Sequence, residues 1–265
     1  MGKSLNNIFF LLFAASILLH SNNCFQLNVT NNISNTIIQY NVIKNTSNLD
    51  AIKLFDNEIG DEFAAQVMSN ATTFAWQVLN QTDYASEEKY IPKVISLYLS
   101  DFAGYGLENY ETIKISAWYI NSTYHTLGNT SKLLFTSLMY HEITHIVQWK
   151  PNEAPYGLIE GIADYVMRKS GYYQEEWYKK VGSGKTWDEG YEITEMFLEY
   201  CDSLKNGFTA QLNKKMRYSY SDDYFEELLG KNVSQLWKDY KAIHGNINDT
   251  SDQATNIRLI AGLNY

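Results

Sequence analysis

Two histidines four residues apart, with a glutamate directly after the first, form the segment best suited to chemistry. The segment HEITHIVQW contains His141, Glu142 and His145 in the spacing H-E-x-x-H. On an α-helix, positions i and i+4 lie on one face, so both imidazoles could bind one metal ion. Glu142, rotated about 100° from His141, would reach a water on that ion without binding the ion itself. The spacing therefore predicts a zinc site in which Glu142 takes a proton from water.

An amphipathic helix without a metal is the alternative interpretation. Leu134, Leu138, His141 and His145 follow helical spacing and could simply form an inward-facing stripe. The H-E-x-x-H pattern also arises by chance in many proteins. A third ligand would separate the two interpretations, because catalytic zinc needs three protein ligands and one open position.

Two carboxylates at helical spacing, Glu160 and Asp164, follow in the segment GLIEGIADYV. Their neighbours are apolar, and acids on so apolar a helix need a partner. Glu160 would complete a His₂Glu ligand set, and Asp164 would accept the outer N–H of a ligand histidine. The reverse assignment stays open, although the order E-x-x-x-D resembles that of zinc peptidases with a glutamate ligand. We expect Gly157 and Gly161 to let this helix approach the histidine helix closely.

Hydrophobic spacing indicates the elements that position these residues. Strands are expected at 37–43, 94–99 and 113–118, and a helix at 57–80. From Ser131 onward the pattern is helical, over 131–149, 155–169, 188–203, 206–217, 222–229 and 233–243. None of the three prolines interrupts these runs. The pattern predicts an α+β fold, with a small N-terminal mixed sheet and helices followed by a mostly helical C-terminal part.

The N-terminus reads as a secretory signal peptide. Lys3 precedes the apolar run 8–19, which is too short to span a bilayer and is followed by polar residues. We expect cleavage near Cys24, and no membrane span elsewhere. The 265 residues would then comprise a signal peptide (1–24), one peptidase domain (25–245) and a C-terminal tail (246–265).

Sequons and cysteines agree with secretion. Asn-X-Ser/Thr occurs at Asn28, Asn32, Asn45, Asn70, Asn80, Asn121, Asn129, Asn232 and Asn248. We expect several of them to be glycosylated at the surface. If cleavage removes Cys24, Cys201 remains as a buried structural thiol. The net charge of −9 and pI of about 5.1 argue against nucleic acid as a partner.

Several blocks resemble, in order, the plant basic secretory protein family, which is zincin-like. They are YHEITHIVQW, APYGLIEGIADYV, WDEGYEITEMFLEYCDSLKNGF, LNKKMRYSYSDDYF and LLGKNVSQLWKDYK, with DNEIGDEFA and IKISAWYI upstream. The resemblance covers about residues 54–243. It implies a secreted, zincin-like metalloprotein in which His141, His145 and the E-x-x-x-D segment form the metal centre and Glu142 is the catalytic acid or base. This chain is acidic, with a net charge of −9, although the family is called basic.

Other candidates are weaker. Tyr191 follows TWDEG and could stabilise an oxyanion, or could simply pack. Residues 113–118 could form an exposed sheet edge to which a peptide adds as a strand. The segment GSGKT, 182–186, lacks the first glycine of a phosphate-binding loop and is expected to be a surface loop. We expect packing roles for His125, His244 and the aromatic residues Tyr172, Tyr173, Trp177 and Tyr178, although the aromatic run could line a groove.

The sequence thus predicts a secreted, glycosylated zinc metallopeptidase acting on a peptide or protein. His141, His145 and Glu160 would hold Zn²⁺, Glu142 would be the general base, and Asp164 would orient a histidine. The alternative is a non-catalytic defence protein, or one that binds a cell wall or surface, with the same metal site retained.

Overall fold

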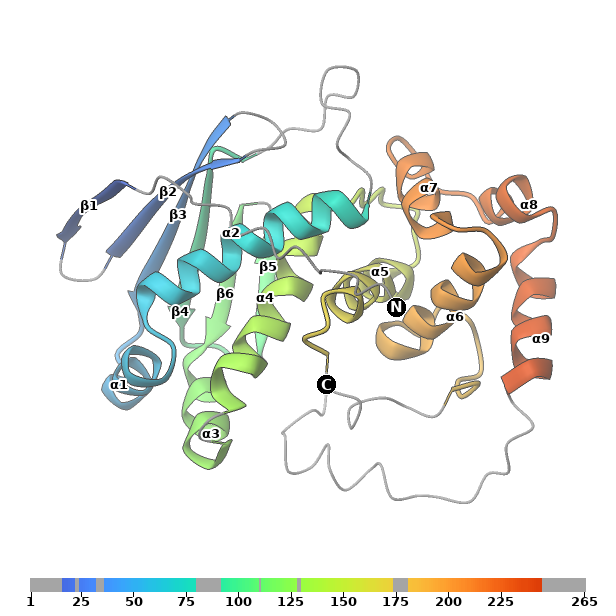
Figure 1. The fold of residues 1–265 in the computed structure, drawn as a ribbon. Coiled ribbons are helices and arrows are strands. Elements are labelled where there is room, and N and C mark those ends of the chain that lie inside the picture. The colour runs from blue at the N-terminus through green and yellow to red at the C-terminus, as the bar shows by residue number, and fades with distance from the viewer. Residues whose placement is uncertain are drawn as a thin grey trace, which may run out of the picture.

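A mixed six-stranded sheet forms the N-terminal part of the protein (Figure 1). The computed structural model describes residues 16–21, 24–31, 36–79, 92–109, 111–127, 130–173 and 181–244. The strands are β1 (Ser16–Ser21), β2 (Cys24–Asn31), β3 (Thr36–Asn45), β4 (Val94–Ser100), β5 (Gly106–Asn109) and β6 (Thr112–Ser116).

The strand order is β1-β2-β3-β4-β6-β5. The three middle strands β3, β4 and β6 are parallel, with Tyr40 opposite Ile95 and Leu97 opposite Ile113. The pairs β1–β2, β2–β3 and β5–β6 are antiparallel. A parallel pair needs a long crossover connection, and helices α1 and α2 lie in the connection between β3 and β4. Strand β5 comes last in the strand order, next to β6, and so forms one edge of the described sheet.

Nine helices pack on the sheet or on one another in the described part of the chain. They are α1 (Leu49–Glu58), α2 (Asp61–Val78), α3 (Ala117–Leu127), α4 (Ser131–Val147), α5 (Tyr156–Lys169), α6 (Tyr191–Leu204), α7 (Phe208–Lys215), α8 (Asp223–Leu229) and α9 (Val233–His244). Helices α2 and α4 pack on each other, with α2 against β2 and β3 and α4 against β5. Helix α5 packs on α4, and α6 packs on α5 (Figure 1).

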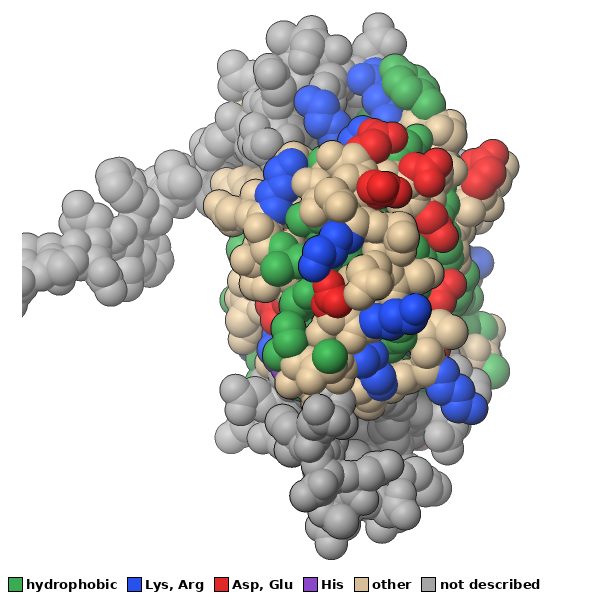
Figure 2. Space-filling model, turned by 90° about the vertical axis from the view of Figure 1, so that its right-hand side faces the viewer, with side chains coloured by type: hydrophobic (Ala, Val, Ile, Leu, Met, Phe, Trp, Pro, Cys, Tyr) green, Lys and Arg blue, Asp and Glu red, His purple; other side chains and the backbone are tan. Residues whose placement is uncertain are grey.

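Buried hydrophobic side chains form one cluster that runs from Phe25 in β2 to Tyr240 in α9. On the outer face of the C-terminal helices, Lys and Arg side chains are interspersed with Asp and Glu (Figure 2). Within the described ranges, no helix combines the length and the apolar character needed to cross a bilayer.

The predicted α+β class is confirmed, with a mixed N-terminal sheet and a mostly helical C-terminal part. The helix predicted over 57–80 is confirmed as α2 (Asp61–Val78), but α1, which ends at Glu58 just before Gly60, was not predicted. Asn48 starts α1 by accepting a hydrogen bond from the Ala51 N–H at 3.0 Å. The prediction missed α1 because its sequence, LDAIKLFDNE, is nearly as polar as it is apolar.

The prediction that 113–118 forms an exposed sheet edge is wrong. Strand β6 lies between β4 and β5, so both of its edges are paired, and β5 forms the edge of the described sheet on that side. Ala117 and Trp118 are the first residues of α3. The Ser116 hydroxyl accepts a hydrogen bond from the Tyr119 N–H at 3.4 Å, which is how an N-cap serine ends a strand and begins a helix.

Strand β1 lies within the segment predicted as a signal peptide. It pairs with β2, with Ile17 opposite Leu27. Cleavage stays a prediction. If it takes place near Cys24, it removes β1 and leaves β2 as the edge of the sheet on that side.

Candidate metal centre

Helices α4 and α5 carry the residues predicted to bind metal. The second half of α4 is buried from Met139 to Val147, so its polar side chains must find partners inside the protein. Helix α5 begins directly after Pro155, whose φ of −54° suits a helix start. Gln148 links the two helices, because its side-chain amide donates to the Ile159 carbonyl at 3.1 Å.

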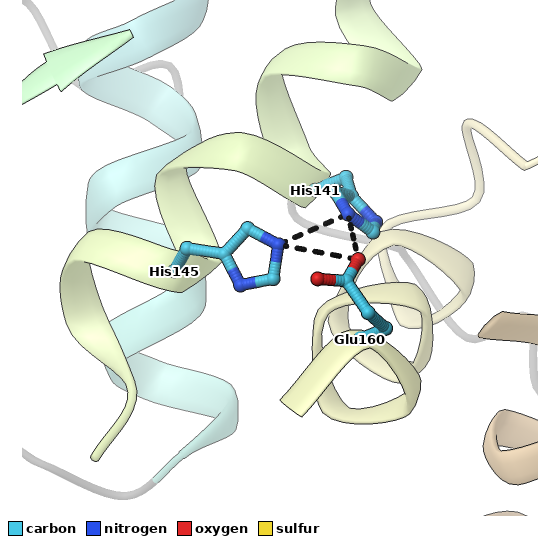
Figure 3. Close-up of side chains that lie close together, drawn as sticks. All are labelled: His141, His145 and Glu160. Carbon is cyan, nitrogen blue, oxygen red and sulfur yellow. Dashed lines mark hydrogen bonds and ion pairs between the residues drawn. The ribbon is translucent and has the colours of Figure 1, made fainter. Parts of the chain in front are cut away.

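Three buried side chains converge between these helices (Figure 3). The Nε2 atoms of His141 and His145 are 3.1 Å apart. Glu160 Oε2 lies 3.1 Å from His141 Nε2 and 3.6 Å from His145 Nε2. Within the described part of the chain, this is the one group of three or more His, Cys, Asp or Glu residues whose ligand atoms converge closely enough to hold a metal ion.

The spacing of these atoms fits a tetrahedral zinc ion. Zinc–nitrogen and zinc–oxygen bonds of about 2.0–2.1 Å place neighbouring ligand atoms roughly 3.3 Å apart. The three separations of 3.1, 3.1 and 3.6 Å bracket that value. Two imidazoles and one carboxylate are also a donor set that zinc accepts, and they leave a fourth position open. The residues present therefore fit a metal ion.

Asp164 contacts the other ring nitrogen of His141. Its Oδ1 lies 2.7 Å from His141 Nδ1. An ionised carboxylate can only accept a hydrogen bond, so Nδ1 carries the proton and Nε2 is left to face Glu160 and His145. Gln148 Nε2 lies 2.7 Å from Nδ1 of His145. Asp164 thus holds His141 from behind, as metal sites orient a ligand histidine, whereas the Gln148 amide nitrogen can only donate to His145.

The carboxylates and the rings shift each other's pKa values. Burial alone would lower the pKa of His141, but hydrogen bonds and charge from Asp164 and Glu160 outweigh it and hold the pKa well above its usual value. Burial would raise the pKa of Glu160, yet the two rings lower it far below its usual value. Burial lowers the pKa of His145 to about 4. Glu160 is therefore anionic and His145 neutral at neutral pH, the forms that bind metal, whereas the raised pKa of His141 favours its protonated form, so metal binding there would release a proton.

Glu142 is buried beside the three converging residues and faces strand β5. Its pKa is raised to about 7, chiefly by burial; the charge of His141 opposes this rise, and the charges of Glu160 and Glu108 add to it. Gly106 makes this position possible, because a Cβ on that residue would lie 2.4 Å from Glu142 Oε1. A carboxyl group with a pKa near 7 can both take and return a proton at neutral pH.

Tyr191 lies at the centre with a strained backbone. Its ring stacks on that of His141, with centroids 6.2 Å apart and planes 14° from parallel. Its φ of 47° is rare for an aromatic residue, and such strain concentrates at functional sites. The Tyr191 hydroxyl lies 3.3 Å from the Tyr156 hydroxyl. Tyr156 was not among the site residues predicted from the sequence. Tyr156 is 70% exposed, and its hydroxyl interacts with Glu160.

The predicted role of Gly157 and Gly161 is wrong. A Cβ on Gly157 would collide with the Asp188 carbonyl, and one on Gly161 would lie 2.4 Å from Thr194 Cγ2. These glycines therefore let α6 and the loop before it approach α5, and do not face α4. Gly161 follows Glu160 directly and is rotated by about 100° from it, so the two cannot share one face of the helix.

The remaining sequence candidates lie away from the centre. Residues 182–186 form a loop whose Gly184 carbonyl accepts from Lys241 at 2.8 Å, so the surface-loop prediction is confirmed. Cys201 is fully buried, as predicted. The His244 ring packs on Tyr240. Tyr172 packs on Tyr140. The side chains of His125, Trp177 and Tyr178 lie outside the described residues.

A family model described as "Peptidase of plants and bacteria" (BSP) matches residues 35–240, a range that includes α4 and α5. The chain belongs to this family. The resemblance noted from the sequence blocks is thereby confirmed. Membership in a BSP peptidase family makes peptides or proteins the expected class of substrate.

One relative and one solved structure show how far the similarity extends. A protein named "Basic secretory protease" from Boswellia serrata is 41% identical over 65 residues, which are 24% of this chain and 77% of the relative. An aminopeptidase N family protein from Idiomarina loihiensis has a TM-score of 0.32 and 15% identity, over 90% of this chain and 43% of its own. The chain thus spans less than half the length of that solved structure.

Proposed function

We propose that this protein is a secreted zinc metallopeptidase of the zincin type, built as one domain over residues 25–245. The observation that supports this most strongly is the buried convergence of His141, His145 and Glu160 beside Glu142, in a chain of a peptidase family. Zinc fits the donor set better than magnesium or calcium, which prefer oxygen ligands.

His141, His145 and Glu160 would hold the ion, and Asp164 would keep His141 in the tautomer that binds it. When bound, zinc would lower the pKa of a water molecule and polarise the carbonyl group of the substrate. Glu142 takes the proton of the attacking water and passes it to the leaving amine. Its pKa of about 7 matches that double role, although a bound cation would lower this value.

The positions of two tyrosine hydroxyls support a role in stabilising charge. Those of Tyr191 and Tyr156 are 3.3 Å apart, beside His141 and Glu160. We propose that Tyr191 donates a hydrogen bond to the oxyanion that forms during peptide cleavage, supported by Tyr156. The strained backbone of Tyr191 is consistent with a position fixed by this role.

The substrate would bind along the free edge of β5. This strand ends the described sheet, and the carboxyl group of Glu142 lies directly against its Gly106. An extended peptide paired with β5 as an additional strand would therefore pass close to the general base.

Secretion and glycosylation are also part of the proposal. The apolar run 8–19 has the length and flanks of a signal peptide, and the Boswellia relative is named a secretory protease. Three of the sequon asparagines, Asn45, Asn70 and Asn232, are exposed and accessible to a glycan.

Hydrolysis of casein and of quenched peptides, with and without a chelator, tests the function. We expect the zinc-loaded protein to cleave peptide bonds, to lose this activity when the chelator removes zinc, and to regain it when zinc is returned. Cleavage by protein shown to be free of metal would contradict the proposal. Full zinc occupancy with no cleavage across a broad peptide panel would favour the non-catalytic alternative.

A further inference from the structure

Strand β5 carries a buried carboxylate that the mechanism above does not use. Glu108 is two residues from Gly106, so both side-chain positions lie on the same face of the strand. That face meets α4, because the space at Gly106 is filled by the Glu142 carboxyl group. Leu107, between them, is 54% exposed on the opposite face. Glu108 therefore faces the same side of β5 as the candidate metal centre.

Only half of this carboxylate is satisfied. Its Oε2 accepts from Lys150, which follows the end of α4. Its Oε1 is buried and receives no hydrogen bond from the described residues. The Glu108 side chain is 6% exposed, so bulk water reaches little of it. A buried carboxylate oxygen without a donor is unusual in a folded protein, and it points to a missing partner.

Charge decides which kind of donor this oxygen suits. Glu108 is buried on the face of β5 where the Glu142 carboxyl group fills the space at Gly106, so two carboxylates lie on one side of this strand. Lys150 contacts Oε2, while Oε1 receives no hydrogen bond from the described residues. A positively charged donor at Oε1 would both form a charge-assisted hydrogen bond and offset the buried charge of Glu108. A neutral N–H group would supply only the first of these.

We propose that Glu108 is a specificity-determining residue that binds a cationic nitrogen of the substrate. The group would be an ammonium or guanidinium close to the bond to be cleaved. Two sources have this chemistry, namely the free N-terminus of a peptide and the side chain of a lysine or arginine within it. The inference rests on the proposed function, since it assigns a substrate class to the same site.

Peptide binding to zinc-loaded protein that carries Glu142→Gln tests this without turnover. One peptide pair differs only in a free or acetylated N-terminus and contains no lysine or arginine. A second pair is acetylated and differs in lysine or norleucine next to the scissile bond. We expect the cationic member of at least one pair to bind about tenfold more tightly, and the pair that shows this identifies the source.

Adding Glu108→Gln should reduce the preference to less than about twofold, because the amide keeps the shape but loses the charge. Glu226→Gln, an equal change at an exposed position of α8, should leave the preference intact. Glu108→Asp keeps the charge on a shorter side chain and should weaken the preference without abolishing it, which guards against a glutamine variant that fails to fold. Zinc content and melting temperature check each protein.

Equal binding of both members in both pairs would overturn the inference, and so would a preference that survives Glu108→Gln. Because binding needs no hydrolysis, the result is separate from the fate of the proposed function. If the protein prefers the cationic peptide but the wild type cleaves no peptide, the proposed peptidase function is rejected and the proposed binding role of Glu108 is retained.

Discussion

Glu142→Gln is expected to lower kcat for peptide hydrolysis by roughly 10²–10⁴-fold, the usual contribution of a general base. Glutamine keeps the size of the side chain and its fit beside Gly106, but it cannot take a proton from water. Glu142 is not one of the three residues whose ligand atoms converge, so zinc content should remain at one per chain.

Steady-state cleavage of a quenched peptide, with zinc measured on the same samples, checks this result. Glu226→Gln removes one exposed carboxylate from α8 and should retain wild-type kcat. If Glu142→Gln keeps full zinc and stays within about threefold of wild-type kcat, Glu142 is not the general base.

Glu160→Ala and Asp164→Ala should weaken zinc binding to different extents. Glu160 Oε2 faces both Nε2 atoms, so its removal takes away a ligand. Asp164 contacts only the outer nitrogen of His141. Loss of such an orienting residue typically costs about 10–100-fold in metal affinity, and loss of the ligand should cost more.

Competition against a chromophoric chelator measures both affinities under the same conditions. Glu153→Ala, at an exposed position between α4 and α5, provides the matched control and should bind zinc as the wild type does. The opposite order, with Asp164→Ala the weaker binder, would make Asp164 the ligand and Glu160 the orienting residue. That outcome would restore the alternative that the sequence alone left open.

Much of the centre could be predicted from the sequence because it depends on spacing within single helices. His141 and His145 share a face of α4, and Glu160 and Asp164 share a face of α5, as residues four apart must. The sequence also placed acids among apolar residues, which required a partner nearby. The partners were inferred from chemistry, and the structure brings them within 3.6 Å of one another.

The residues that were missed depend on contacts between elements distant in sequence. Glu108 and Gly106 lie on a strand of only four residues, GLEN, in which Leu107 is the one apolar side chain, so no hydrophobic pattern marked it. Their contact with α4 follows from the sheet order, which places β5 and not β6 at the edge. Tyr156 gave no signal beyond its place after Pro155. For α3, a signal was present, since Ser116 is a preferred N-cap residue.

Anomalous diffraction at the zinc absorption edge, from crystals of the zinc-loaded protein, tests the central claim most directly. The account predicts one strong peak between α4 and α5, about 2.0–2.1 Å from Nε2 of His141, Nε2 of His145 and a carboxylate oxygen of Glu160. A strong peak at another place in the molecule, or none between these helices in crystals grown with excess zinc, would contradict it.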